Sequence, residues 1–297
     1  PDIIESADPY RLAWATLDAA QALGVPAVAF CHSNLEQMAR MAAGERWQAP
    51  AAAAARRYAA HLYRQFDLVL APSQAMADHL TDWGVKGAQR QSLGVDTTTF
   101  FPADRDPNWR AAHGLPNDAR VLIYAGRFAP EKNLGLLVDA VRLLGPRHWL
   151  VAVGAGPAVP SGDRVLVLPQ VAQAADLAAL LVNADLFVHA GTQETFGLSA
   201  LEALACGVPV VAPAAEGLAE LVDDSLGCAV QRPSAQSLAE AIAATLARDR
   251  HALGRAARAR GLAHDWNQVL PQLWQHYRRV MACGPIDAAP AARALQP

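Results

Sequence analysis

The sequence predicts an α/β protein built from two Rossmann-like domains that face each other across a cleft. Short apolar runs alternate with segments whose apolar residues recur at helical spacing, which is typical of βα units around a parallel sheet. Residues 66–73 and 184–191 also resemble each other, each as a strand whose carboxyl end opens a loop. At 297 residues and 53% hydrophobic content, the chain is long enough for two buried cores.

Eight apolar runs are predicted to be strands. They lie at residues 27–30, 68–71, 121–125, 150–153, 165–168, 186–189, 208–212 and 228–230. Residues 1–5 also read as a strand, already inside a domain rather than at a natural start. We therefore expect the N-terminal domain to be truncated.

Composition places the domain boundaries. Residues 101–107 are polar and contain two prolines, so we predict the interdomain linker there or just after it. Beyond residue 283 the chain is rich in Ala and Pro without periodicity, which is typical of a disordered tail. The sequence thus predicts a partial N-terminal domain at residues 1–104 and a complete second domain at residues 105–266. An amphipathic helix at residues 267–283 could cross back onto the first domain, and residues 284–297 form the tail.

Charge and apolar content exclude several classes of protein. The formal net charge is −3, so no global basic field indicates nucleic acid as the main ligand. The four cysteines are widely spaced and form no CxxC pair, so neither a zinc site nor a disulfide framework is predicted. No stretch is apolar enough to span a membrane or to act as an export signal, which favours the cytoplasm.

One segment, residues 51–66, raises the question of membrane contact. It carries Arg56, Arg57, Arg64 and Tyr58, and it reads either as a membrane-surface helix or as the solvated face of a domain helix. Two adjacent arginines are too few for stable anchoring to anionic lipid. The prediction is therefore at most a weak peripheral contact at the inner membrane face.

The first candidate site follows the strand at 121–125. The loop Gly126-Arg127-Phe128 leads to Lys132 and Asn133 and then at once into a helix. In open α/β sheets ligands bind at the carboxyl ends of strands, and an Arg and a Lys there can clamp phosphate oxygens. Arg127 and Lys132 are thus predicted diphosphate ligands. The alternative is that both are solvated loop charges.

The second candidate site lies between residues 189 and 212. A loop carrying Glu194 enters a helix near Gly197, so the free backbone N–H groups of Phe196, Gly197 and Leu198 can point at an anion. Glu202 lies about two turns into this helix among apolar neighbours. A carboxylate there needs a hydrogen-bond partner, which ribose hydroxyls would supply. A capping or i,i+4 role is the structural alternative for either glutamate.

Taken together, these residues resemble the GT-B retaining glycosyltransferases of family 4, with bacterial α-mannosyl- and α-glucosyltransferases as the nearest relatives. The resemblance covers most of residues 2–280. It rests on Gly126-Arg127-Phe128 with Lys132-Asn133, on Glu194 and Glu202 separated by seven residues, on Gly207-Val208-Pro209-Val210, and on Gly94-Val95-Asp96 followed by Phe100 and Pro102.

The resemblance implies transfer of a hexose, mannose or glucose, from a nucleotide-diphosphate sugar of the GDP-mannose or UDP-glucose type to a glycan or lipid acceptor. It implies no metal and no other cofactor. It also implies a front-face mechanism in which the leaving diphosphate itself serves as the base, so no carboxylate nucleophile is expected. In this family Arg127 and Lys132 would hold the diphosphate, Glu194 the transferred sugar and Glu202 the ribose.

Further site residues follow from the same resemblance. His32 would reach the donor sugar from the first domain, although a buried core histidine is the alternative. His32, Arg127, Lys132 and Glu194 form the implied catalytic set. Additional donor contacts are expected through the backbone or pocket wall at Gly126, Gly154, Val171, Thr195, Phe196, Gly197 and Leu198.

Two functions of other classes remain open. A nucleotide-sugar epimerase would share the architecture but need acid and base groups in the cleft, and a non-catalytic nucleotide-sugar binder would need neither. The family's glycine-rich loop after its first strand has no counterpart in this sequence. The acceptor therefore stays unidentified.

Overall fold

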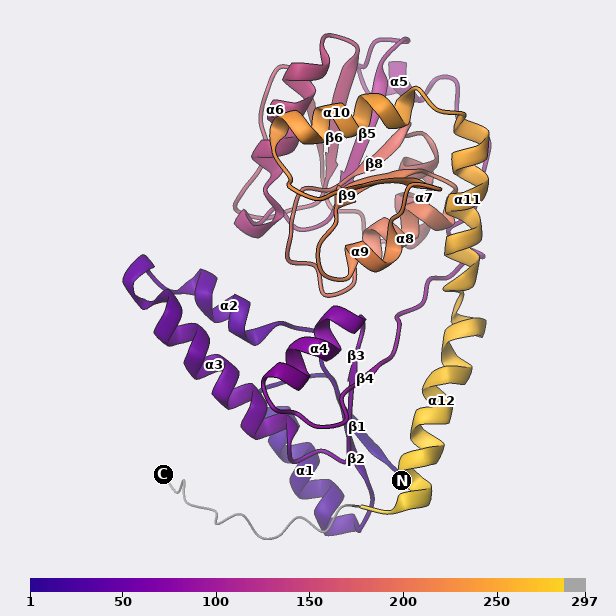
Figure 1. Ribbon diagram of the computed structural model, residues 1–297. Helices are drawn as coiled ribbons and strands as arrows, with labels where there is room; N and C mark the ends of the chain where they lie inside the picture. Colours follow the sequence, from indigo (N-terminus) through magenta and orange to yellow (C-terminus); the bar gives the residue numbers. More distant parts are fainter. Residues whose placement is uncertain (286–297) are drawn as a thin grey trace. The chain divides into compact units, whose positions relative to one another are not determined.

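The computed structural model describes residues 1–285, which divide into two compact units (Figure 1). The first unit comprises Pro1–Ser92 together with the chain from Val269 onward, and the second comprises Leu93–Gln268. The sequence placed the boundary after residue 104, whereas contacts assign residues 93–104 to the second unit, where Phe100 is part of the core. The tail predicted at 284–297 lies outside the described residues from 286 on.

The first unit is a parallel sheet of four strands with helices around it. The strands are β1 (Ile4–Ser6), β2 (Ala27–Phe30), β3 (Leu68–Ala71) and β4 (Gln89–Arg90), in that spatial order. The helices are α1 (Arg11–Leu23), α2 (Leu35–Ala42), the 3-10 turn η1 (Glu45–Trp47), α3 (Gln48–Tyr63), α4 (Gln74–Asp82) and, from Val269 on, α12 (Trp266–Cys283). Sequence patterning correctly located β2 and β3. It missed β4, which is two exposed polar residues without an apolar run.

The second unit is a six-stranded parallel sheet in the order β10-β9-β8-β5-β6-β7. Its strands are β5 (Arg120–Ala125), β6 (His148–Val153), β7 (Val165–Leu168), β8 (Leu186–Val188), β9 (Val210–Pro213) and β10 (Gly227–Val230). The chain starts in the middle at β5, winds outward to β7 and then returns to β8 on the other side of β5. This is the Rossmann order, and its topological switch point lies between β5 and β8.

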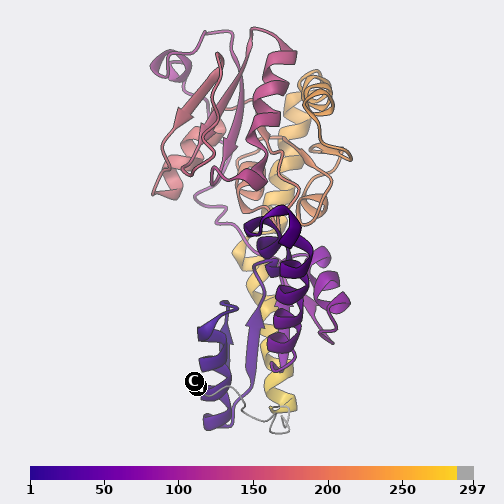
Figure 2. The ribbon, with the colours of Figure 1, turned by 90° about the vertical axis from the view of Figure 1, so that its left-hand side faces the viewer.

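Helices cover both faces of this sheet (Figures 1 and 2). One core contains Leu122 and Tyr124 of β5 and packs against α6 (Leu134–Leu144) and α10 (Ala235–Leu246). The other contains Val121, Ile123 and Ala125 of the same strand. It packs against α7 (Ala174–Val182), α8 (Leu198–Ala205), α9 (Leu218–Leu221) and α11 (Arg250–Ala263). Strand residues thus alternate between two cores, as a doubly wound sheet requires.

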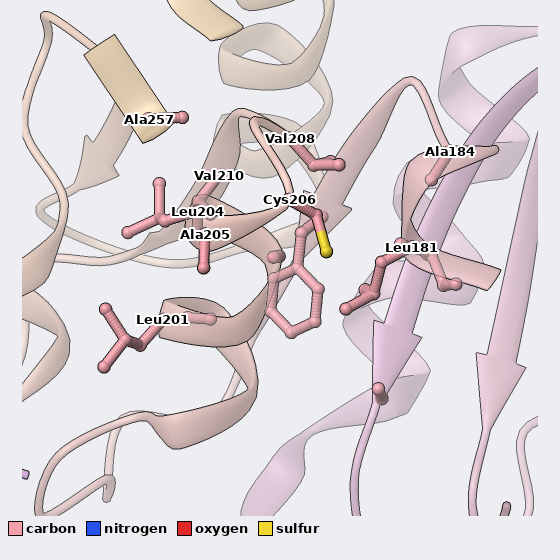
Figure 3. Packing of buried hydrophobic residues seen from close by; sticks show 14 of the residues in the cluster. Leu181, Ala184, Leu201, Leu204, Ala205, Cys206, Val208, Val210 and Ala257 are labelled. Atoms are coloured by element: carbon pink, nitrogen blue, oxygen red, sulfur yellow. The ribbon is translucent and has the colours of Figure 1, made fainter. Parts of the chain in front are cut away.

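The second of these cores holds α8 firmly. Leu201, Leu204, Ala205 and Cys206 are buried between the sheet and α11 (Figure 3). The strand predicted at 208–212 starts later, at Val210, because the Val208 amide donates to the Ala203 carbonyl and closes the end of α8. The start of α8, which bears the candidate site, is therefore attached to a rigid element.

The similarity between residues 66–73 and 184–191 has a structural cause. In the first unit the Ala27 amide donates to Asp67 Oδ2 at 2.7 Å and the Asp67 amide donates to the Ala27 carbonyl at 2.9 Å. In the second, the Val121 amide donates to Asp185 Oδ2 and the Asp185 amide to the Val121 carbonyl, both at 2.8 Å. Each Asp therefore joins the starts of two neighbouring parallel strands.

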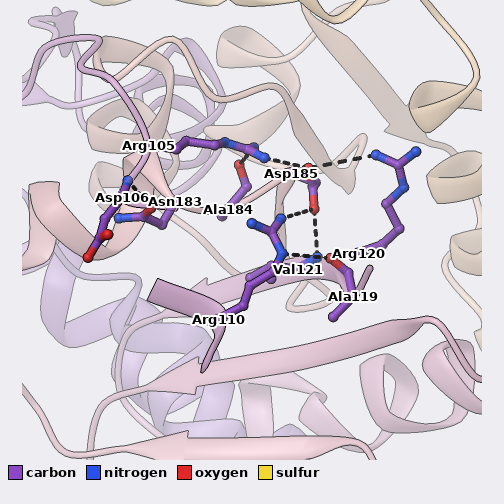
Figure 4. Close-up of polar contacts among 9 residues, drawn as sticks. All are labelled: Arg105, Asp106, Arg110, Ala119, Arg120, Val121, Asn183, Ala184 and Asp185. Carbon is purple, nitrogen blue, oxygen red and sulfur yellow. Dashed lines mark hydrogen bonds and ion pairs between the residues drawn. The ribbon is translucent and has the colours of Figure 1, made fainter. Parts of the chain in front are cut away.

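The second copy of this motif also anchors the segment that the sequence marked as a linker. Arg105 and Arg110 contact Asp185 at 2.8 and 3.2 Å, and the Asp106 amide donates to Asn183 Oδ1 at 3.0 Å (Figure 4). The nearby positive charges more than offset burial, which alone would raise the pKa of Asp185, and so that pKa is lowered. Residues 105 and 106 are consequently fixed to the second unit.

Candidate functional site

The two predicted site loops lie next to each other. Residues 126–133 follow β5 and residues 189–197 follow β8, and these strands pair in parallel through Leu122 with Leu186 and Ile123 with Phe187. Both loops therefore leave the same edge of the sheet at the topological switch point. That crevice is where ligands bind in open α/β folds.

A lysine, a glutamate and a histidine meet between these loops. Lys132 Nζ forms a hydrogen-bonded ion pair with Glu194 Oε1. His189 Nε2 lies 3.1 Å from the same oxygen. Lys132 is only 8% exposed, although lysine is almost never buried without a partner. The cluster therefore places a cation and an oriented carboxylate at the site.

His189 was not predicted as a site residue; its backbone was assigned to the end of a strand. The strand ends at Val188, and His189 is the first residue of the loop. The Gly191 amide donates to His189 Nδ1 at 3.1 Å, so Nδ1 is an acceptor. From this partner geometry we assign a proton to Nε2, which donates to Glu194. A polar residue where a buried strand ends was the signal in the sequence.

Glu194 remains ionised well into the acid range. Burial alone would raise the pKa of its carboxyl group. The hydrogen bond from His189 and the charge of Lys132 outweigh burial and bring that pKa down to about 2. The loop backbone is also fixed, because the Gly217 amide donates to the Glu194 carbonyl at 2.8 Å. Glu194 is thus a preorganised acceptor of hydrogen bonds that is charged at neutral pH.

Arg127 has a different environment from Lys132. Its side chain is 75% exposed and pairs with Glu131 at 3.2 Å. The Tyr124 hydroxyl donates to the Arg127 carbonyl at 2.9 Å and so holds the backbone of the loop. The guanidinium therefore lies at the open side of the loop, where only a surface ion pair holds it.

Glycines allow a third loop to pack against the first. A Cβ atom on Gly154 would lie 1.9 Å from the Gly126 carbonyl oxygen, and one on Gly156 would lie 2.2 Å from the Phe128 carbonyl oxygen. The Phe128 amide donates to the Ala155 carbonyl at 2.8 Å. Gly154 and Gly156 are therefore required for the close approach of two backbones. This packing supports the loop that carries Arg127 and Lys132.

Glu202 lies in α8 and has no such support. Burial raises the pKa of its carboxyl group to about 7. Within residues 1–285, nothing donates a hydrogen bond to that carboxylate or forms an ion pair with it. Gly197, with a φ of 97°, lets the chain turn into α8, and Leu198 at its start is 45% exposed. A half-buried carboxylate without a partner is a strong candidate for ligand binding.

The remaining predicted residues lie outside the cluster of Lys132, Glu194 and His189. Phe196 is buried, and Thr195 is in the same loop. Val171 is in the loop between β7 and α7 and packs on the core. His32 belongs to the first unit, where it follows β2 and stacks on Phe30 with 4.2 Å between ring centroids. Burial lowers the pKa of His32, which favours the neutral ring.

Neither a metal-binding cluster nor a membrane-spanning helix occurs in the described part of the chain. Among residues 1–285, no group of three or more His, Cys, Asp or Glu side chains is placed to hold a metal ion. No helix in that range is long and apolar enough to cross a membrane.

Both halves of the chain match known protein families. Residues 105–260 match the glycosyl transferases group 1 family, and residues 1–99 match glycosyltransferase family 4. A GDP-mannose-dependent alpha-mannosyltransferase of Mycolicibacterium smegmatis is 32% identical over 295 residues, which cover 97% of this chain and 76% of that protein. A D-inositol 3-phosphate glycosyltransferase of the same species is 33% identical over 204 residues, covering 64% of this chain and 46% of that protein.

A solved structure agrees with the fold. Sucrose-phosphate synthase from Thermosynechococcus elongatus superposes with a TM-score of 0.81 and 27% identity, covering 95% of this chain and 74% of that one. The two parallel-sheet units are thus the two domains of the GT-B fold, as the sequence predicted. The chain belongs to the group 1 glycosyltransferases and is a hexosyltransferase that uses a nucleotide-sugar donor.

Proposed function

We propose that this enzyme transfers mannose from GDP-mannose, with retention of the anomeric configuration, to a glycan or lipid acceptor. The cluster of Lys132, Glu194 and His189 at the switch point carries this proposal, because it pairs a phosphate-binding cation with a fixed hydroxyl-binding carboxylate. Mannose is preferred over glucose because relatives at 30–32% identity over almost the whole chain are GDP-mannose-dependent alpha-mannosyltransferases.

Lys132 and Arg127 are the proposed diphosphate ligands. Negative charge develops on the leaving diphosphate as the sugar bond breaks, and fixed cations in a partly buried site stabilise it. Lys132 would exchange part of its contact with Glu194 for phosphate oxygens. Arg127, being exposed, would turn away from Glu131 toward the diphosphate. Backbone amides of Phe196, Gly197 and Leu198 would add donors at the start of α8.

Glu194 would accept hydrogen bonds from hydroxyls of the transferred sugar. His189 supports this role, because it still donates to Glu194 when Lys132 turns to phosphate. We propose His189 as a positioning residue on this basis. Glu202 would accept hydrogen bonds from the ribose, which supplies the partner that its carboxylate lacks.

The pocket walls and the acceptor side complete the proposal. Gly126, Gly154, Thr195 and Val171 would line the donor site through their backbones. His32, with its neutral ring, would contact a sugar hydroxyl from the first unit. The leaving diphosphate would take the proton of the acceptor hydroxyl on the same face, so no carboxylate nucleophile is invoked. A location in the cytoplasm remains a prediction.

The donor can be identified by calorimetry with GDP, UDP, GDP-mannose and UDP-glucose. We expect GDP and GDP-mannose to bind at least about tenfold more tightly than their UDP counterparts, which is a difference of about 1.4 kcal/mol. Transfer to a panel of glycan and lipid acceptors, followed by NMR of the anomeric proton, tests retention. A product of inverted configuration would refute the mechanism, and preference for UDP-glucose would refute the donor.

Metal independence is tested separately. Lys132 and Arg127 supply the positive charge that a divalent cation otherwise provides at a leaving diphosphate. We expect EDTA to leave both nucleotide affinity and transfer unchanged. Loss of transfer that magnesium or manganese restores would contradict this expectation.

A further inference from the structure

One buried tyrosine contacts both loops of the candidate site. Tyr124 belongs to β5, which leads into the loop of residues 126–133, and its side chain is only 1% exposed. Side chains of a strand alternate between the two faces of the sheet, and Tyr124 faces the core that packs against α6 and α10. A buried tyrosine hydroxyl needs a hydrogen-bond partner. That partner lies in the site loop itself.

The Tyr124 hydroxyl fixes the peptide unit that follows Arg127. The hydroxyl donates to the Arg127 carbonyl at 2.9 Å, and the amide of the same peptide unit, at Phe128, donates to the Ala155 carbonyl at 2.8 Å. Both ends of this peptide unit are therefore held. The tether matters because Gly126, with a φ of 152°, precedes Arg127 and has no side chain to restrict its rotation. Without the hydroxyl, the direction in which the Arg127 side chain leaves the loop would be less defined.

The ring of Tyr124 contacts the other loop. Its centroid lies 5.7 Å from that of the His189 ring, and His189 Nε2 is 3.1 Å from Glu194 Oε1. The ring is therefore a packing partner of the histidine that orients Glu194. Burial raises the pKa of Tyr124, and the negative charges of Glu194 and Glu131 raise it further. The hydroxyl thus stays protonated and able to donate at neutral pH.

We propose that Tyr124 is a positioning residue for both loops of the donor site. Its hydroxyl would hold the Arg127 backbone so that the guanidinium can reach the diphosphate. Its ring would hold His189 so that Glu194 stays oriented toward the transferred sugar. This inference rests on the proposed function, because Tyr124 would act only through Arg127 and His189. Phenylalanine at this position would keep the packing and lose the tether.

Tyr124→Phe tests the hydroxyl, because it keeps the ring and removes only the hydrogen bond to Arg127. Calorimetry with GDP at low salt should show an affinity roughly 3- to 10-fold lower, as expected where one neutral hydrogen bond holds the guanidinium in place. In the Arg127→Ala background the same change should have almost no effect, since no guanidinium is left to position. The loss should also shrink at high salt, because it acts through an exposed charge.

Tyr58→Phe is the matched control. The Tyr58 hydroxyl also donates to a backbone carbonyl, that of Pro9 at 2.8 Å, but both residues lie in the first unit. This variant should bind GDP like the original chain, whether or not its melting temperature falls.

Tyr124→Leu also removes the ring and tests the support of His189. We expect kcat to fall roughly tenfold below that of Tyr124→Phe, because a displaced reacting group lowers the rate steeply. This additional loss should vanish in the His189→Phe background, where no hydrogen bond to Glu194 is left to orient. If Tyr124→Leu does not fold, Tyr124→Phe alone decides the inference.

Three results would overturn the inference. If Tyr124→Phe binds GDP like the original chain while Arg127→Ala binds it more weakly, the inference fails and the proposed function stands. Equal losses from Tyr124→Phe in the original and Arg127→Ala backgrounds would have the same meaning, because the effect would then come from the fold and not through Arg127. Unchanged GDP affinity in Arg127→Ala would overturn both this inference and the proposed role of Arg127.

Discussion

Glu194 and Glu202 flank the start of α8 only eight residues apart, yet their surroundings are opposite. Glu194 receives a hydrogen bond from His189 and pairs with Lys132, and its pKa falls to about 2. The Glu202 carboxylate is partly buried and has no hydrogen-bond or ion-pair partner within residues 1–285, and its pKa rises to about 7. The chain therefore supplies partners for the Glu194 carboxylate and, within residues 1–285, none for the Glu202 carboxylate.

The two carboxylates consequently change stability with pH in opposite directions. Glu194 has a folded-state pKa below the ordinary value of 4.5, so it contributes stability above pH 4.5 that is lost as the pH falls toward 2. Glu202 has a folded-state pKa above 4.5, so the folded state loses stability as the pH rises from 4.5 through 7. A ligand that donates hydrogen bonds to Glu202 would recover that loss.

Lys132→Met should have the largest effect, because it removes the buried cation from Glu194 and from the proposed diphosphate site. We expect kcat to fall roughly 100- to 1000-fold, as when a preorganised charge-stabilising group is removed. Affinity for GDP should fall about tenfold or more. Steady-state kinetics and calorimetry measure the two effects.

The chain offers a close control, since Lys86 is its only other lysine and is exposed. Lys86→Met should change neither quantity. Equal GDP affinity in Lys132→Met and the original chain would remove Lys132 from the diphosphate site.

His189 variants test whether Glu194 needs its second partner. His189→Phe keeps an aromatic ring near Tyr124 but has no donor for Glu194. A shift of about 1 Å in a reacting group costs on the order of 100-fold, so we expect a loss of roughly 10- to 100-fold in kcat. GDP affinity should stay unchanged, since GDP has no transferred sugar.

His189→Gln places an amide donor near the former Nε2 position and should recover much of the loss in kcat. A Gln variant as slow as the Phe variant would indicate that His189 acts through packing rather than through its hydrogen bond to Glu194.

Glu202→Gln should separate stability from binding. Glutamine does not titrate, so at pH 8 the free variant should be more stable than the original chain by on the order of 2 kcal/mol, with no difference in this contribution below pH 4.5. Affinity for GDP should nevertheless fall about tenfold, because ribose hydroxyls lose an ionised acceptor. Thermal unfolding across pH and calorimetry give both quantities.

A dideoxyribose analogue of GDP sharpens this test. If Glu202 binds the ribose hydroxyls, Glu202→Gln should weaken the analogue much less than it weakens GDP, because the two changes remove the same contact. Glu240→Gln is the control. Glu240 lies on α10, and within residues 1–285 its side chain forms a hydrogen bond only with Gln236. Additive losses would place Glu202 away from the ribose.

Arg127→Ala should have the smallest effect. An exposed guanidinium is screened by solvent and salt, so we expect about a tenfold loss of GDP affinity at low salt and less at high salt. Arg142→Ala is matched, since Arg142 is also exposed and paired with a nearby acid, Asp139. If both variants bind GDP as the original chain does, Arg127 is a solvated loop charge.

The local pattern of apolar and polar residues was enough to predict most of the buried strands and the two site loops. Apolar runs located the buried strands, because a parallel strand covered on both faces must be continuously apolar. The site loops were also predictable, since ligand-binding residues in such folds follow strand ends. Lys132 and Glu194 were predicted in this way, and the structure brings them into contact.

The contacts between residues that are distant in the sequence were decided only by the tertiary structure. His189 became a partner of Glu194 because Gly191 turns the chain back onto its ring, and the linker became part of the second unit because Arg105 reaches Asp185, eighty residues away. Likewise, the different pKa values of Glu194 and Glu202 depend on which groups surround each carboxylate, and not on the residue itself. The amino-acid sequence by itself predicted most of the buried strands and the strand ends that the two loops follow. Burial, partners and charge balance arise only when distant segments pack, because electrostatic interactions depend on distance in space.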